Sequence, residues 1–165
     1  IHLFDRGFQG TVFFTAQEES GSSWRFLLEW FRRFGNRTGR LVVVDTSPYP
    51  DAVSAEAQDV VLRHRDANAW FDTAFTARIE DLCREHHLRF GYKDEYLQSQ
   101  TATTKGTAPS LGSTELGRLI VGSEGRISGT TLQIPCHGYH TLEETATMQA
   151  ANSFLRLLES IEELV

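Results

Sequence analysis

Three predicted strands in this chain are followed by side chains that can bind a metal or move a proton. Glu18 and Glu19 come after the first apolar run, Asp45 closes the second, and His140 follows the last. In open α/β sheets, ligands bind outside the carboxyl ends of the strands. Carboxylates and a neutral imidazole suit zinc or another divalent first-row metal, and an adjacent second carboxylate can act as general base on an activated water.

Each of these residues also has a purely structural explanation. Adjacent glutamates after a strand commonly hydrate a turn, and an Asp before Thr-Ser-Pro commonly caps a turn through its own backbone. His140 could serve only as a hydrogen-bonding residue at a helix entry, where Thr141 and Glu144 have the spacing of a capping box. The order and spacing of the whole set, rather than any one member, favour a functional site.

The segments around these residues predict strands that alternate with helices. Runs of β-branched and aromatic residues predict strands at residues 10–16, 41–44, 59–63, 88–92 and 130–135. Apolar residues at helical spacing predict helices over residues 23–34, 70–83 and 116–121, and a last helix from Thr141 that buries residues such as Ala150, Phe154 and Leu164. This alternation predicts an α/β fold with a mixed β-sheet sandwiched between helices.

Two further local expectations bear on the site. The continuous apolar run 41–44 is typical of an interior strand covered on both faces, which would place Asp45 at its carboxyl end. Residues 98–113 are polar and rich in Thr, Ser and Gly, which predicts an exposed loop of the kind that often forms a functional lid.

Composition narrows the class of protein. The length of 165 residues suits a single domain over 1–165, and the net charge of −6 disfavours binding to nucleic acid or to an anionic membrane. No apolar run is long enough to span a membrane, and the first residues lack a signal peptide's pattern, so we expect a cytoplasmic protein. Cys83 and Cys136 are too few for a disulfide framework or a cysteine-based zinc cluster.

Four segments of the chain together resemble a known family. They are residues 15–21 (TAQEESG), 43–45 (VVD), 112–115 (GSTE) and 134–144 (IPCHGYHTLEE). In this order they resemble the motifs of cocatalytic-zinc exopeptidases, most closely the glutamyl and deblocking aminopeptidase branch. The acylase, carboxypeptidase and dipeptidase branch is related to it. The resemblance covers only the later part of the catalytic domain, so we expect a partial zinc-exopeptidase-like domain that lacks the family's N-terminal portion.

The resemblance implies an aminopeptidase-like exopeptidase that hydrolyses N-terminal peptide bonds with water activated by two zinc ions. Cobalt or manganese could replace zinc. The implied general base is Glu18, the ligands of one metal are Glu19 and His140, and Asp45 binds the second metal. The residues implied to lie near a peptide substrate are Thr114, Glu115 and His137, of which His137 is also the best substitute ligand. Family members form large hollow assemblies, so we expect a homo-oligomer.

The sequence also departs from the family's pattern. Ser113 replaces the usual Gly, Glu115 the usual Asp, and Leu142 the Pro that follows the ligand His. The family carries a His-x-Asp segment and a metal-bridging Asp upstream of the Glu-Glu pair, and this chain has 17 residues before Glu18. Asp5 is a poor candidate for that bridge because residues 5–10 cannot hold the helix that should follow it. Without the bridging carboxylate, the second metal should bind weakly.

Three alternatives stay open at this stage. The chain could be an acylase or dipeptidase of the related branch, acting on N-acyl or dipeptide substrates. It could be a non-catalytic remnant that keeps the fold and serves assembly or binding, which the missing upstream ligands favour. It could also use Cys136 as a nucleophile with His137 or His140 as base, although neighbours in sequence seldom reach that geometry.

Overall fold

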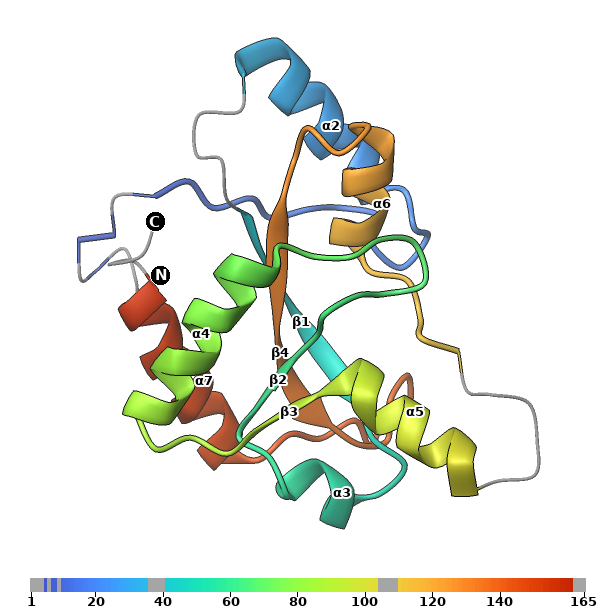
Figure 1. Ribbon diagram of the computed structural model, residues 1–165, viewed down its shortest axis with the longest axis vertical. Coiled ribbons are helices and arrows are strands. Elements are labelled where there is room, and N and C mark those ends of the chain that lie inside the picture. The colour runs from blue at the N-terminus through green and yellow to red at the C-terminus, as the bar shows by residue number, and fades with distance from the viewer. Residues whose placement is uncertain (1–4, 6, 9, 36–40, 104–109, 162–165) are drawn as a thin grey trace.

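The sheet at the centre of the molecule is mixed, as the sequence predicts. The computed structural model describes residues 5, 7–8, 10–35, 41–103 and 110–161. Within them the strand order is β1-β4-β2-β3. Parallel pairing joins β1 (Leu41–Pro48) to β4 (Gly129–Cys136) and β2 (Val60–Leu62) to β3 (Phe90–Tyr92), whereas β2 is antiparallel to β4. Helices cover both faces (Figure 1), so the α/β sandwich is confirmed.

One face of the sheet is covered by α4 (Thr73–Glu85) and α7 (Met148–Ile161), which lie side by side (Figure 1). The side chains of Val60 and Leu62 point toward these helices and are fully buried. Asp72 begins α4 by accepting a hydrogen bond from the Phe75 backbone N–H at 2.9 Å, as N-cap residues do. This face holds the main apolar core.

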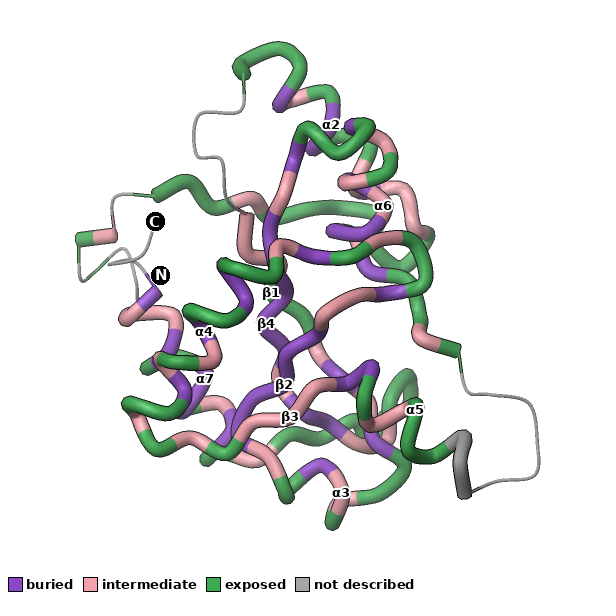
Figure 2. Tube along the Cα trace, in the orientation of Figure 1, coloured by how far each residue is buried: buried purple, intermediate pink, exposed green. Residues whose placement is uncertain are grey.

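The opposite face carries α3 (Ala52–Glu56) and α5 (Lys93–Thr103). Val61 points to this face because side chains alternate along a strand, and it packs with Tyr49, Ala55 and Tyr96. Figure 2 shows buried residues concentrated along β2 and β4, the two central strands. Gln133 and Asp45 share this second face, because both stand in register with Val61 across the sheet.

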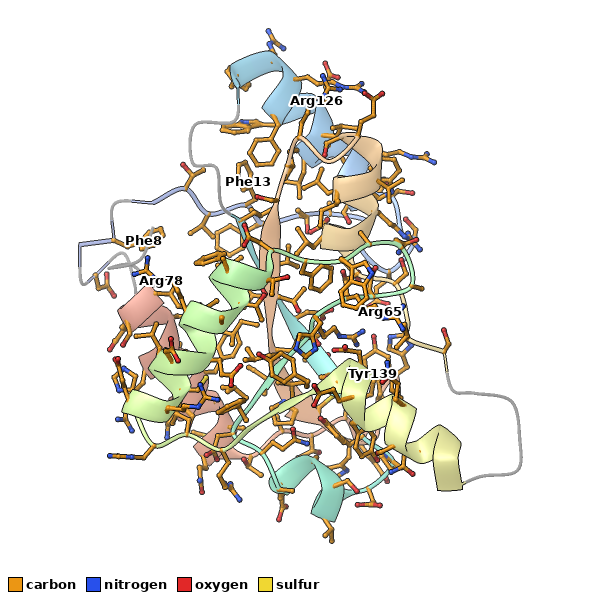
Figure 3. The ribbon with its side chains drawn as sticks, in the orientation of Figure 1. Phe8, Phe13, Arg65, Arg78, Arg126 and Tyr139 are labelled. Carbon is orange, nitrogen blue, oxygen red and sulfur yellow. The ribbon has the colours of Figure 1, made fainter. Side chains whose placement is uncertain are left out.

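A second packing unit lies beside the sheet, where α2 (Ser23–Phe34) packs against α6 (Glu115–Gly122). Both helices match the sequence prediction, and Gly35 ends α2 with a left-handed φ of 79°. Phe13 points toward α2 (Figure 3), with its ring edge-on to Trp30 at a centroid distance of 4.8 Å. The two helices approach closely because Gly122 leaves room for the Trp24 ring.

The predicted strand at residues 10–16 is wrong. These residues form no strand, and Phe14 keeps 88% of its surface exposed. Phe13 is the one residue of this segment that is not exposed, because it packs against the aromatic side chains of α2. A strand needs a hydrogen-bonding partner as well as suitable residues, and this segment pairs with no strand in the described part of the chain.

The predicted interior position of residues 41–44 is also wrong. These residues begin β1, which lies at an edge of the sheet and continues to Pro48, so Asp45 sits within the strand rather than after it. Val44 is 51% exposed. A continuous apolar run shows that a strand is favoured, but it does not show which strands will flank it.

The helix boundaries give two further corrections. Residues 98–103 continue α5, which begins with Asp94 and Glu95 in its first turn, whereas 104–109 lie outside the described residues. The last helix begins at Met148 instead of Thr141, and Thr147 Oγ1 accepts a hydrogen bond from the Ala150 backbone N–H at 3.0 Å. Ala150 and Phe154 are buried as predicted, and Leu164 lies outside the described residues.

Candidate functional site

A tight turn presents the two adjacent glutamates just before α2. The Gly21 backbone N–H donates to the Glu18 carbonyl at 2.6 Å, and Gln17 and Gly21 both have a left-handed φ of 65°. The Arg118 guanidinium of α6 donates to the Gly21 carbonyl at 2.6 Å and fills the space that a side chain at residue 21 would need. Glu18 and Glu19 are therefore held against α6 while their side chains remain exposed.

His140 lies in a closed loop that follows β4. His137 and Thr145 close this loop by exchanging backbone hydrogen bonds of 3.1 and 3.0 Å. The Glu144 carboxylate accepts from the His140 backbone N–H at 3.2 Å, so Glu144 shapes the loop and caps no helix. Tyr139 stacks on the His140 ring with a centroid distance of 3.9 Å. The capping box predicted for Thr141 and Glu144 is wrong for this reason.

The turn and the loop bring two predicted ligands together. Glu19 Oε2 lies 3.3 Å from His140 Nε2, and both side chains are exposed, at 80% and 57% respectively. An exposed carboxylate–imidazole pair stabilises a fold only slightly. The structure thus holds two good metal donors side by side without an evident structural reason.

Asp45 contributes a third carboxylate to the same electrostatic environment. Its Oδ1 accepts from the Thr46 backbone N–H at 2.7 Å. Burial by surrounding atoms raises the pKa of Asp45, and the charge of Glu19 raises it further. Burial likewise raises the pKa of Glu18, with additional contributions from the negative charges of Asp45, Glu19 and Glu115. The negative charges of the predicted catalytic and metal-binding carboxylates therefore help to raise the pKa values of Glu18 and Asp45.

A cavity of about 240 Å³ opens beside the two glutamates. Its wall includes residues from the turn, from the start of α6 and from the loop after β4, among them Glu18, Glu19, Thr114, Glu115, Arg118 and Tyr139. Figure 3 shows Tyr139 on the side of the sheet that carries α5. The cavity is large enough for a single amino-acid side chain and adjoins the proposed general base.

The predicted substrate residues fall into different environments. Glu115 lines the cavity; its Oε2 accepts from Thr15 Oγ1 at 3.5 Å, and its Oε1 is buried with no hydrogen-bond partner among the described residues. Thr114 is buried, and its hydroxyl donates to Asp66 Oδ2 at 2.9 Å while capping α6. The backbone of His137 closes its loop, and the residue does not line this cavity.

Several residues near the site were missed by the sequence reasoning. Arg63 and Gln133 are buried polar side chains behind Asp45, and Asp66 anchors the start of α6. A charged residue directly after the wholly apolar strand Val60–Leu62, and a glutamine within an apolar strand, were signals in the sequence for buried polar contacts.

The donor set only partly fits a metal centre. No group of three or more His, Cys, Asp or Glu residues in the described part of the chain lies close enough to hold a metal ion. Glu19 and His140 suit zinc as a pair, but Asp45 does not lie close enough to form a three-ligand group with them. Cys136 is a poor nucleophile because burial raises its pKa and its thiol hydrogen-bonds Glu144 Oε1 at 3.6 Å.

Comparison with solved structures shows what this fold is similar to. A TET aminopeptidase from the marine sediment archaeon Thaumarchaeota archaeon SCGC AB-539-E09 matches with a TM-score of 0.70 and 13% identity, over 97% of this chain and 42% of that one. The fold is similar to part of a TET aminopeptidase. PhTET1-12s, described as a dodecamer in the asymmetric unit, matches with a TM-score of 0.64 and 16% identity, over 90% of this chain and 40% of that one.

The chain therefore spans well under half the length of each of these two structures. No family model and no curated protein matches the sequence. Among the described residues, no helix is both long and apolar enough to cross a membrane.

Proposed function

We propose that this chain is the later part of the catalytic domain of a metal-dependent aminopeptidase that cleaves N-terminal peptide bonds. The observation that carries the proposal is the 3.3 Å approach of Glu19 Oε2 to His140 Nε2, with Glu18 next to Glu19 in the sequence. The fold's similarity to part of a TET aminopeptidase supports it. Further ligands would have to come from outside the described residues.

In this proposal the metals are held by side chains of two kinds. Glu19 and His140 bind one metal, and Asp45 binds the second; zinc, cobalt or manganese suit such donors. The bound metals supply electrostatic polarisation of water and of the scissile carbonyl. The exposure of Glu19 and His140 leaves their donor atoms accessible to a metal from solution.

Glu18 acts as the general base. It takes a proton from the attacking water and delivers it to the leaving amine. Its raised pKa suits this role because a general base works best when its pKa lies near the working pH. Glu115 lines the same cavity, and a carboxylate there suits contact with the ammonium group at a peptide's N-terminus.

The test is zinc stoichiometry of the purified 165-residue chain, measured by elemental mass spectrometry beside Glu19→Gln and His140→Ala. The matched control is His87→Asn, which removes an exposed histidine at a left-handed position that Asn tolerates. We expect bound zinc in the wild type and in the control, falling to background in both site variants. Equal zinc in all four proteins would overturn the assignment.

The type of substrate needs a separate measurement. An aminopeptidase requires a free α-amino group, so peptides with a free N-terminus should be cleaved and N-acetylated peptides should not. Cleavage of acylated substrates instead would favour the acylase or dipeptidase alternative. The same assay on Glu18→Gln should lose turnover while zinc binding is kept, because Glu18 is proposed to transfer protons and not to bind metal.

A second candidate function is a non-catalytic remnant that serves assembly. The observation that favours it is that no three-donor metal group forms within the described residues. One of the solved structures with a similar fold is described as a dodecamer, so we propose that this chain forms a homo-oligomer. Light scattering on the purified chain measures its mass; a folded oligomer without zinc binding would favour the remnant.

A further inference from the structure

A charged side chain is buried directly behind Asp45. Arg63 follows the last residue of β2 and is only 6% exposed. Its Nε donates to Gln133 Oε1 at 2.8 Å, and its Nη1 donates to the Leu111 carbonyl at 2.6 Å. Burying a guanidinium costs free energy unless its donors are satisfied, so its position calls for an explanation beyond packing.

Gln133 connects this guanidinium to the edge strand. It lies in β4 in register with Asp45 on one side and with Val61 on the other, so its side chain shares a face with Asp45. Its amide nitrogen donates to the Thr46 carbonyl at 3.0 Å, and its side chain lowers the pKa of the Asp45 carboxyl on the same face. Gln133 is 1% exposed, so water cannot compete for these bonds.

Arg63 decides which way the Gln133 amide faces. A guanidinium has only donors, so the amide oxygen must face Arg63. The amide NH₂ group must then face β1, where it meets Thr46 and Asp45. If the amide were reversed, its oxygen would face the Thr46 carbonyl and the Asp45 carboxylate, and acceptors would oppose acceptors.

The same end of β2 also holds the segment that leads into α6. Arg63 binds the Leu111 carbonyl, and Asp66 accepts from both the backbone N–H and the hydroxyl of Thr114, at 2.7 and 2.9 Å. Gly117 leaves the space that the Asp66 carboxylate occupies. The short stretch from Arg63 to Asp66 therefore positions both Gln133, whose side chain faces Asp45, and the segment that carries Glu115 to the cavity.

We infer that Arg63 is a positioning residue, which orients the Gln133 amide toward Asp45 and fixes the segment before α6. The part of this inference that concerns metal binding by Asp45 rests on the proposed function. The orientation of the Gln133 amide does not depend on that function. The competing explanation is that Arg63 only balances the carboxylates of Asp45, Asp66 and Asp94 around it, in which case any buried cation would serve.

Two variants separate these explanations. Arg63→Met keeps an unbranched apolar stem that reaches about as far as the arginine Nε, and it removes all the donors. Arg63→Lys keeps the charge but replaces the rigid fork with one compact ammonium group, which cannot make both contacts in the same geometry. The control is Lys93→Met, because Lys93 is also a buried cation on this face of the sheet but donates to the Pro48 carbonyl instead of Gln133.

The first measurement uses the metal-free chain. Solution NMR resolves the Gln133 side-chain NH₂ group, which should exchange slowly with solvent in the wild type and in Lys93→Met. In Arg63→Met and Arg63→Lys we expect exchange to be faster by about tenfold or more, because the amide is no longer held. Unchanged exchange in both Arg63 variants would overturn the inference, even if the chain binds no metal.

The second measurement is zinc affinity, obtained by competition with a chromophoric chelator. Residues that orient metal ligands typically alter affinity by about 10- to 100-fold when they are changed. We expect a loss of that size in both Arg63 variants and none in Lys93→Met. Full retention in Arg63→Lys would show that charge balance alone is needed. If the wild type binds no zinc, the proposed function fails and the NMR result alone decides the role of Arg63.

Discussion

Glu19 and His140 belong to segments near opposite ends of the chain, yet Glu19 Oε2 and His140 Nε2 lie 3.3 Å apart. The first is placed by the turn that Arg118 holds against α6, and the second by the loop that His137 and Thr145 close. Neither side chain is needed to fill the core, because both are largely exposed. This convergence of two independent structural elements is the strongest support for a site.

Removing one member of this pair should cost little stability in the absence of metal. For Glu19→Gln we expect a loss of at most about 1 kcal/mol, because exposed ion pairs contribute no more than that. Added zinc, at about 100 times its Kd, should stabilise the wild type by about 2.7 kcal/mol but leave the variant unchanged. Urea unfolding with and without zinc measures both effects; equal stabilisation of the two proteins would contradict the assignment.

Asp66 should be far more important for stability than its charge alone suggests. It is buried and accepts hydrogen bonds from Asn68 and Ala69 as well as two from Thr114. In Asp66→Asn one acceptor oxygen becomes a donor facing donors, so we expect a loss of about 2–4 kcal/mol in the free energy of unfolding. Asp81→Asn, an exposed residue paired with Arg84, is the control and should change it by less than about 0.5 kcal/mol.

Replacing Gly122 with alanine should destabilise the protein, although helix propensity alone predicts the opposite. Alanine is favoured over glycine inside a helix by about 1 kcal/mol. At residue 122, however, an added Cβ would overlap the Trp24 ring, so we expect Gly122→Ala to destabilise the protein by about 1–3 kcal/mol. The double variant with Trp24→Leu should recover part of the loss, and a thermodynamic cycle measures the coupling. Additive effects would show that the two residues do not meet.

Lys93 should make the stability rise at alkaline pH. Burial lowers its pKa from 10.5 to about 8, although its ammonium also lies 3.9 Å from the centre of the Tyr49 ring. Between these two pH values the unfolded state binds more protons than the folded state, so the free energy of unfolding increases with pH, by up to about 3 kcal/mol. Below about pH 8 both states are protonated and this contribution to the slope disappears.

The measurement is urea unfolding from pH 7.5 to 10.5 for the wild type and Lys93→Met. The wild-type curve minus the variant curve should therefore rise with pH, because methionine has no proton to exchange. Burial raises the pKa of Tyr49 and of Cys83 to about 12 in the folded state, so these two groups lower the free energy of unfolding at alkaline pH, but they do so equally in both proteins and cancel in the difference. Parallel curves for the two proteins would show that Lys93 keeps its ordinary pKa.

Local sequence patterns predicted the elements that depend on local chemistry. The helix that Gly35 stops follows from apolar spacing and a glycine stop signal, and the helix predicted at residues 116–121 follows from its apolar residues. The strands around Val61 and Gln133 follow from β-branched runs. The last helix was placed too early because the spacing of Thr141 and Glu144 is compatible with both a capping box and a closed loop.

The sequence by itself determined the donor types at Glu18, Glu19, Asp45 and His140, the alternation of strands and helices, and the α/β class. Only the tertiary structure decided that Glu19 meets His140, that Asp45 lies on an edge strand, and that Arg63 and Gln133 stand behind it. The reason is physical. Local chemistry sets which backbone conformation a segment prefers, but the neighbours of a side chain are set by strand order and helix packing between residues far apart in the chain.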